Sequence, residues 1–242
     1  MASMWSSPGW EPTPVAAASS HGYSFTGTSL GSVRITKLGH ACWRLAKDGS
    51  VLVIDPGSFS GGEPLDGAQA VLITHEHPDH VDVGLLASAP PDLEIYTCQA
   101  VADRLSDVPA RVHAVREGDA FTAAGFSVRV FGEWHAPNHP DLPVVQNVGF
   151  FIDEEVFYPG DALTVPGVEV PTLLVPTNAP WLKTSEMVEY LRAVRPARAY
   201  STHDGLVNEI GLRLIDGWLE MEAGKQRADF RRIPVGESVE LP

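Results

Sequence analysis

The chain has 242 residues, of which 44% are hydrophobic and 20% are charged, and its formal net charge is −14. This apolar content is ordinary for a folded protein and argues against global disorder. The acidic balance disfavours nucleic acid or an anionic membrane surface as the main partner, because both require a basic surface. We therefore expect a folded protein whose main partner is neither nucleic acid nor a membrane surface, although a local basic patch could still bind either.

Targeting signals are weak in this sequence. Residues 1–31 are rich in Ser, Pro, Gly and Ala and lack the basic and apolar regions of a secretory signal, so we expect a flexible extension there and one domain over residues 32–242. No apolar run approaches the roughly 18 residues of a membrane span. Cys42 and Cys98 form neither a disulfide framework nor a CxxC pair, so we expect two buried thiols. Together these features favour a cytoplasmic protein.

Short apolar segments separated by Gly and Pro predict strands along most of the domain. Asp48 and Gly49 predict a turn between two of them, and a short helix is expected to end before Pro109. The expected strands are residues 32–37, 41–46, 51–54, 70–74, 94–97, 111–115, 125–131, 145–152, 156–158, 172–175 and 197–202.

The last third of the chain alternates strands with helices. One helix is predicted over residues 184–194 and is ended by Pro196, and a second is predicted over residues 206–223 and is ended by Gly224. The apolar face of the second helix is formed by Ile210, Leu214 and Trp218. Strands followed by alternating strands and helices predict one layered domain, with sheets inside and helices outside.

The most informative motif is Thr-His-Glu-His-Pro-Asp-His at residues 74–80, directly after an expected buried strand. A strand that ends in such a loop places these side chains at the edge of a sheet, where they can converge. Neutral imidazoles and a carboxylate suit divalent transition metals. The spacing allows His75 and His77 to bind one metal, while Asp79 and His80 can bind a second.

Two metals need more ligands than one loop supplies. His135, Asp161 and His203 are each the first strong ligand type after an expected strand. A single histidine in such a place is more often structural. The repetition of the pattern at three strand ends indicates that all three residues complete the site.

The order of these residues resembles that of the metallo-β-lactamase-fold hydrolases, in which HxHxDH is followed by a later His, a Gly-Asp pair and a final His. The resemblance implies an α/β fold, a four-layer αββα sandwich with the metals at one edge of its two sheets. It assigns one metal site to His75, His77 and His135 and the other to Asp79, His80 and His203, with Asp161 as the bridge.

Residues 38–40 (Leu-Gly-His), 54–56 (Ile-Asp-Pro) and 147–150 (Asn-Val-Gly-Phe) resemble one branch of that superfamily. The branch includes the ascorbate-6-phosphate lactonases and the N-acylphosphatidylethanolamine phospholipase D-like hydrolases. It implies that His40 approaches the active site and donates a hydrogen bond to the substrate, although a structural role for His40 is the alternative. Asp55 is expected to be a hydrogen-bond partner near the site rather than a metal ligand.

The implied chemistry is hydrolysis of a small-molecule ester, lactone or phosphate ester. Two divalent metals bridged by a hydroxide provide a nucleophile at neutral pH, because the metal charge lowers the pKa of bound water from about 15.7 to about 7. Asp79, His40 and Asp161 are the expected catalytic residues. Zinc is the preferred metal and manganese is the alternative, and the electropositive pocket suits a substrate that is small and anionic.

Other functions remain open at this point. One alternative is a metal-binding sensor or docking protein without turnover, and another is a nuclease-type phosphodiesterase. Di-iron oxygen reductases of the superfamily replace the ligand at the position of His77 with Glu, so that class is disfavoured. His139, Lys183 and Asp204 lie near the expected ligands and could line the pocket, contact an anion or orient a ligand histidine, or could equally be structural.

Overall fold

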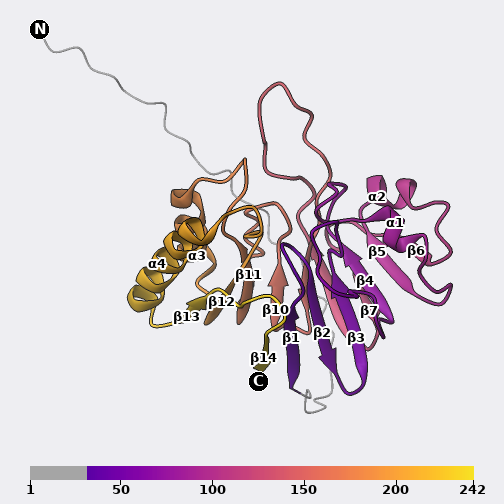
Figure 1. The fold of residues 1–242 in the computed structure, drawn as a ribbon, viewed down its shortest axis with the longest axis horizontal. Coiled ribbons are helices and arrows are strands. Elements are labelled where there is room, and N and C mark those ends of the chain that lie inside the picture. The colour runs from indigo at the N-terminus through magenta and orange to yellow at the C-terminus, as the bar shows by residue number, and fades with distance from the viewer. Residues whose placement is uncertain (1–31) are drawn as a thin grey trace, which may run out of the picture. The chain divides into compact units, whose positions relative to one another are not determined.

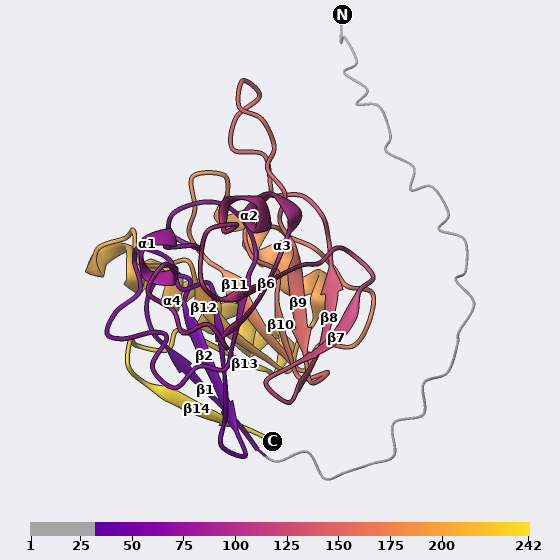
Figure 2. The same ribbon diagram turned by 90° about the vertical axis from the view of Figure 1, so that its right-hand side faces the viewer.

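The structure is a computed structural model, and it describes residues 32–242. The extension expected over residues 1–31 lies outside the described residues. Two seven-stranded sheets form the centre of the described part (Figures 1 and 2). Helices pack outside the sheets, so the predicted layered sandwich is confirmed.

Each sheet combines antiparallel and parallel pairs of strands. The first sheet has the order β14 (Ser238–Leu241), β1 (Val33–Lys37), β2 (Trp43–Lys47), β3 (Ser50–Ile54), β4 (Ala70–Ile73), β5 (Glu94–Thr97) and β6 (Arg111–Ala114). The second sheet has the order β13 (Asp229–Arg231), β12 (Arg198–Thr202), β11 (Thr172–Pro176), β10 (Val156–Tyr158), β9 (Gly149–Ile152), β8 (Phe126–Phe131) and β7 (Ala120–Ala123).

The turn between β2 and β3 shows how local sequence sets the register. Asp48 and Gly49 both have positive φ, at 49° and 78°, and Lys47 pairs with Ser50 across them. Two left-handed residues make the type I′ turn that suits the twist of a hairpin, and Asp-Gly is a favoured pair for it. The predicted turn is confirmed.

The parallel half of each sheet positions the site. Strands β3 to β6 are parallel to one another, and so are β10 to β13. Parallel strands end at the same edge of a sheet, and ligands of open α/β sheets gather at carboxyl ends. The segment between β8 and β9 also projects beyond the strand ends (Figures 1 and 2).

Two apolar clusters hold the layers together. One lies between the sheets, and the alternation of buried and half-buried residues along β8 shows Phe126, Val128 and Val130 pointing into it. The other joins the second sheet to α3 (Thr184–Val194) and α4 (Glu209–Gln226). The two shorter helices are α1 (Val83–Leu86) and α2 (Gln99–Arg104).

The prediction for α4 is wrong in its bounds and in its buried face. The helix begins after Asn208, whose side chain accepts from two backbone N–H groups of the first turn, and it continues past Gly224 to Gln226. The buried residues are Ile215, Leu219 and Glu222 instead of the expected face. Ile210, Leu214 and Trp218 are 62%, 64% and 43% exposed. Both faces of this helix carry apolar residues, so helical spacing alone does not identify the buried one.

Other differences concern short or edge elements. Residues 145–148 do not continue β9; they form isolated bridges, with Asn147 opposite His75 and Gln146 opposite Trp134. Strands β7, β13 and β14 and helix α1 were not predicted. Cys42 and Cys98 are both buried and free, as expected. None of the described helices is long and apolar enough to cross a membrane.

Candidate metal centre

The loop after β4 is held in place by Asp55, which follows β3. The Thr74 N–H donates to Asp55 Oδ1 at 2.8 Å, and the Thr74 hydroxyl donates to Asp55 Oδ2 at 2.7 Å. Nearby, a Cβ on Gly57 would lie 2.1 Å from the backbone of Asp79, so only glycine permits this approach. The two loops therefore pack backbone against backbone, which fixes the residues that follow His75.

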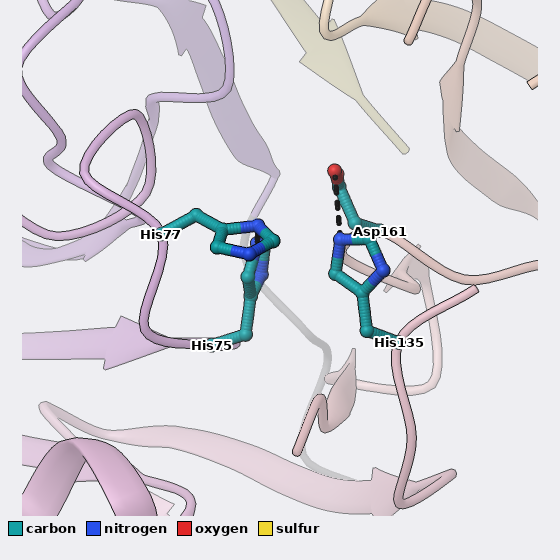
Figure 3. A group of neighbouring side chains, drawn as sticks. All are labelled: His75, His77, His135 and Asp161. Carbon is teal, nitrogen blue, oxygen red and sulfur yellow. Dashed lines mark hydrogen bonds and ion pairs between the residues drawn. The ribbon is translucent and has the colours of Figure 1, made fainter. Parts of the chain in front are cut away.

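The first cluster joins four of the expected ligands (Figure 3). Ligand atoms of His75, His77, His135 and Asp161 all lie within 4.8 Å of one another. His75 Nε2 is 3.0 Å from His77 Nδ1, and His135 Nε2 is 3.4 Å from Asp161 Oδ2. Residues from three separate loops, after β4, β8 and β10, thus meet at one point.

A second set of side chains adjoins the same carboxylate. His80 Nε2 is 3.3 Å from Asp161 Oδ1, and His203 Nε2 is 3.2 Å from Asp161 Oδ2. Asp79 Oδ2 is 3.2 Å from His203 Nε2 and 3.2 Å from His40 Nε2. Three imidazoles, those of His80, His135 and His203, therefore approach the Asp161 carboxylate. The structure brings all seven expected ligands, and His40, into one centre.

Most of the imidazoles are oriented by bonds at Nδ1. His80 Nδ1 donates to Asp55 Oδ2 at 2.6 Å, His203 Nδ1 donates to the Asn178 carbonyl at 2.6 Å, and His135 Nδ1 donates to the Ala136 carbonyl. A neutral imidazole that donates from Nδ1 carries its lone pair on Nε2, which is the arrangement of a metal ligand. These three Nε2 atoms are buried and have no hydrogen-bond partner among the described residues.

His40 has the opposite tautomer. The Gly205 N–H donates to His40 Nδ1 at 2.9 Å, so the lone pair is on Nδ1 and the proton is on Nε2. Burial lowers the pKa of His40, which keeps the ring neutral at pH 7. Its Nε2–H faces Asp79 at 3.2 Å. In this tautomer His40 presents an N–H to the edge of the centre, beside Asp79 and His203.

Asp161 is fixed on every side. Gly160 has φ of +63°, and a Cβ there would lie 2.4 Å from Asn147 Oδ1 and 2.7 Å from Thr74 Cβ. The left-handed backbone and the lack of space both require glycine. The Asp161 N–H donates to Asn147 Oδ1 at 3.0 Å, and Trp181 Nε1–H donates to Asp161 Oδ2 at 2.9 Å. The carboxylate therefore has one orientation.

The charges of the centre are strongly coupled. Burial lowers the pKa of His75 and His77. Burial also acts to lower the pKa of His80, but the carboxylates of Asp161 and Asp55 outweigh it and raise that pKa well above its ordinary value. Burial acts to raise the pKa of Asp161, and His80, His135 and His203 reverse this and hold it well below its usual range. The carboxylates thus remain ionised and attract positive charge.

This donor set fits divalent metal ions. Buried Nε2 atoms without partners and an ionised carboxylate between them are costly unless a cation satisfies them. Imidazole nitrogens with few carboxylates and no thiolate suit zinc, and the carboxylates also admit manganese. The residues around the centre therefore match the metal that the fold implies.

Three side chains with open roles lie outside the cluster or act differently from the expectation. His139 is exposed and lies 3.6 Å from Asp141. Lys183 is exposed and pairs with Glu186 at 3.6 Å. Asp204 does not orient the ring of a ligand histidine; it is buried and pairs with Lys37.

Sequence reasoning missed the partners that set the imidazole tautomers. Asn178 and Ala136 act through backbone carbonyls, and Gly205 acts through its backbone N–H. Every residue type carries these backbone groups, so no side-chain motif could have identified them.

The family model described as "Beta-lactamase superfamily domain" matches residues 34–203. Protein Rv0786c of Mycobacterium tuberculosis is 42% identical over 185 residues, which cover 72% of this chain and 85% of that protein. A UPF0173 metal-dependent hydrolase of Aeropyrum pernix is 30% identical over 96 residues, which cover 37% of this chain and 40% of that protein. The metallo-beta-lactamase fold protein YhfI from Bacillus subtilis has a TM-score of 0.67 and 18% identity, covering 86% of this chain and 99% of that chain. The chain therefore belongs to the beta-lactamase superfamily, and its described part has the metallo-β-lactamase fold.

Proposed function

We propose that this protein is a hydrolase that works with two divalent metal ions, which would be held by the histidine and aspartate side chains around Asp161. The observation that supports this most directly is the convergence of buried imidazole Nε2 atoms without hydrogen-bond partners on one ionised carboxylate. The name of the Aeropyrum pernix relative, a metal-dependent hydrolase, agrees with this chemistry. Metal ions in such a centre polarise the electrophile and lower the pKa of bound water to about 7.

The ligands divide into two sets. His75, His77 and His135 would hold one metal, Asp79, His80 and His203 would hold the other, and Asp161 would be a ligand available to both, since it belongs to two of the clusters that could bind a metal. We propose zinc as the metal and manganese as the alternative. This division is the one that the resemblance implies; in the structure His80 approaches Asp161 Oδ1, and His135 and His203 both approach Oδ2.

The side chains that are not ligands position the reactants. Trp181 donates to Asp161 Oδ2 and so keeps the shared carboxylate from rotating. His40 presents its Nε2–H at the edge of the centre, where it donates a hydrogen bond to an oxygen of the substrate. A donor placed in advance where negative charge develops stabilises the transition state. His40 is therefore proposed to act on the substrate and Asp161 on the metals.

The proposed substrate is a small ester, lactone or phosphate ester, as in the lactonase and phospholipase D-like branch. Lys37, Lys183 and Arg104 flank the segments of the centre, and each already pairs with a carboxylate. An anionic substrate would therefore be attracted by the metal ions themselves rather than by a free lysine or arginine of these segments.

The test is a screen of metal-loaded protein against p-nitrophenyl esters, lactones and phosphodiesters, combined with elemental analysis. Asp161→Asn is expected to abolish hydrolysis and to reduce metal content, whereas His40→Ala is expected to lower turnover with its metal retained. His113→Ala is the control, because His113 lies in β6, where its side chain faces Glu94 at 3.9 Å. Metal-loaded protein that hydrolyses none of these classes would support the sensor alternative.

A further inference from the structure

Helix α4 carries a second apolar face that nothing in the described part of the chain covers. The face, called here the α4 stripe, consists of Ile210, Leu214, Trp218 and Met221, which are 62%, 64%, 43% and 39% exposed. With 3.6 residues per turn and 1.5 Å per residue, they form one line about 16 Å long. Contiguous apolar surface of this kind on a folded protein marks an interaction site. Figure 1 shows α4 as the outermost element on its side of the second sheet.

We infer that the α4 stripe is the interface of a homodimer, in which α4 packs antiparallel against α4 of a second copy about a two-fold axis. An interface with two-fold symmetry must be complementary to itself, because the same patch contributes from both subunits. The charges of α4 and Gly217 meet this condition.

The charges beside the stripe are complementary under this symmetry. Arg213 and Glu220 are exposed, lie two helical turns apart on the same flank of the stripe, and form no ion pair or hydrogen bond within residues 32–242. In an antiparallel pair of helices, residues on the same flank face each other. A two-fold axis beside Gly217 places Arg213 opposite Glu220 of the partner subunit, and the symmetry makes this pair twice.

The same axis explains the glycine at the centre of the stripe. A Cβ on Gly217 would meet nothing within 4 Å, so no contact inside the described chain requires glycine there. Glycine at a crossing point lets two helices approach closely. The register set by the charges also places Met221 opposite position 212 of the second copy, between Ile210 and Leu214 of that copy. Side chains therefore fall into gaps rather than onto one another.

A lipid surface fits the stripe less well than a second copy. Helices that lie on membranes carry Lys and Arg along the polar face. The exposed flanks of α4 instead carry Glu209 and Glu220 beside Arg213, and Lys225 is already paired with Glu222. Mixed charges of this kind favour a protein partner with the same mixture, which a second copy supplies.

The test is the dissociation constant of the full-length protein, measured by sedimentation equilibrium in 0.15 M salt. The wild type is expected to have twice the mass of one chain at micromolar concentration. Leu214→Glu is expected to weaken the dimer about 100-fold, because each dimer contains the change twice. Val235→Glu is the matched control, since Val235 is 62% exposed and lies outside the stripe, and it should leave the dimer unchanged.

Charge reversal tests the register itself. Arg213→Glu and Glu220→Arg should each weaken the dimer by about tenfold, since each creates two like-charge contacts. The double variant Arg213→Glu/Glu220→Arg should recover the wild-type constant, because it restores both opposite-charge contacts. The single variants shift the net charge in opposite directions, so a loss of affinity in both of them cannot be an effect of net charge. A monomeric wild type, vesicle binding that depends on Leu214, or a double variant that stays as weak as the singles would overturn the inference.

Discussion

Gly160→Ala tests whether the backbone before Asp161 builds the centre. The glycine has φ of +63°, and an added Cβ would lie 2.4 Å from Asn147 Oδ1 and 2.7 Å from Thr74 Cβ. A left-handed alanine costs about 1–2 kcal/mol, and forcing a methyl group into a packed interior costs about 1–3 kcal/mol more. We therefore expect a loss of about 2–5 kcal/mol in the free energy of unfolding.

Gly62→Ala separates the two contributions. Gly62 has nearly the same φ, +66°, but a Cβ there would meet nothing within 4 Å. This control should lose only the backbone part, about 1–2 kcal/mol, and should bind metal normally. Gly160→Ala should also bind metal more weakly, because moving Asn147 removes the hydrogen bond that fixes the Asp161 backbone.

The assay is urea unfolding of the metal-free proteins, so that bound metal does not add to the stability, followed by metal titration of each variant. Equal losses for Gly160→Ala and Gly62→Ala, together with unchanged metal binding by Gly160→Ala, would refute the reasoning. That result would mean that the contacts of the Gly160 site do not hold Asp161 in place.

Three further predictions concern groups in and around the centre. Lys37→Met leaves Asp204 buried without its cation and should lower the free energy of unfolding in urea by about 3–5 kcal/mol. The double variant Lys37→Met/Asp204→Asn should recover part of this loss. A loss below about 1 kcal/mol for Lys37→Met would contradict the pairing. Burial raises the pKa of Cys42 to about 12 and also raises that of Cys98, so neither thiol should react with a disulfide reagent at pH 8 until the protein is unfolded; rapid labelling of the native protein would disagree. In metal-free protein, burial lowers the pKa of His203, but Asp161 and Asp79 outweigh burial and raise this pKa to about 9. Protonated His203 therefore stabilises the folded protein; this stabilisation is complete below pH 6.5 and is lost as the pH rises through about 9. Unfolding free energies that stay level over this range would refute the assignment.

The chain order of the ligands was readable because each follows a strand. Apolar segments ending in His75, His135 or His203 predict side chains at strand ends, and the sheets bring these ends together. The pairings that create the centre join residues far apart in the chain. The bond from Gly205 to His40 spans 165 positions and uses a backbone N–H, so no local pattern announces it.

The elements that sequence reasoning missed are those that depend on distant partners. In strand β14 only Leu241 is buried, and the strand forms because it pairs with β1 at the other end of the described chain. In α4, Ile210 and Leu214 satisfy the helical spacing as well as Ile215 and Leu219 do. Only the docking of α3 and the second sheet decides which face is buried. Periodicity therefore identified the helix and not its orientation.

The most direct test of the account is the metal content of the purified protein after loading with excess zinc or manganese and removal of free metal. We expect about two ions per chain in the wild type and a clear loss in Asp161→Asn, whose neutral side chain keeps the shape of the shared ligand without its charge. A wild type that retains no metal, or an Asp161→Asn variant that retains as much metal as the wild type, would contradict a centre built around Asp161.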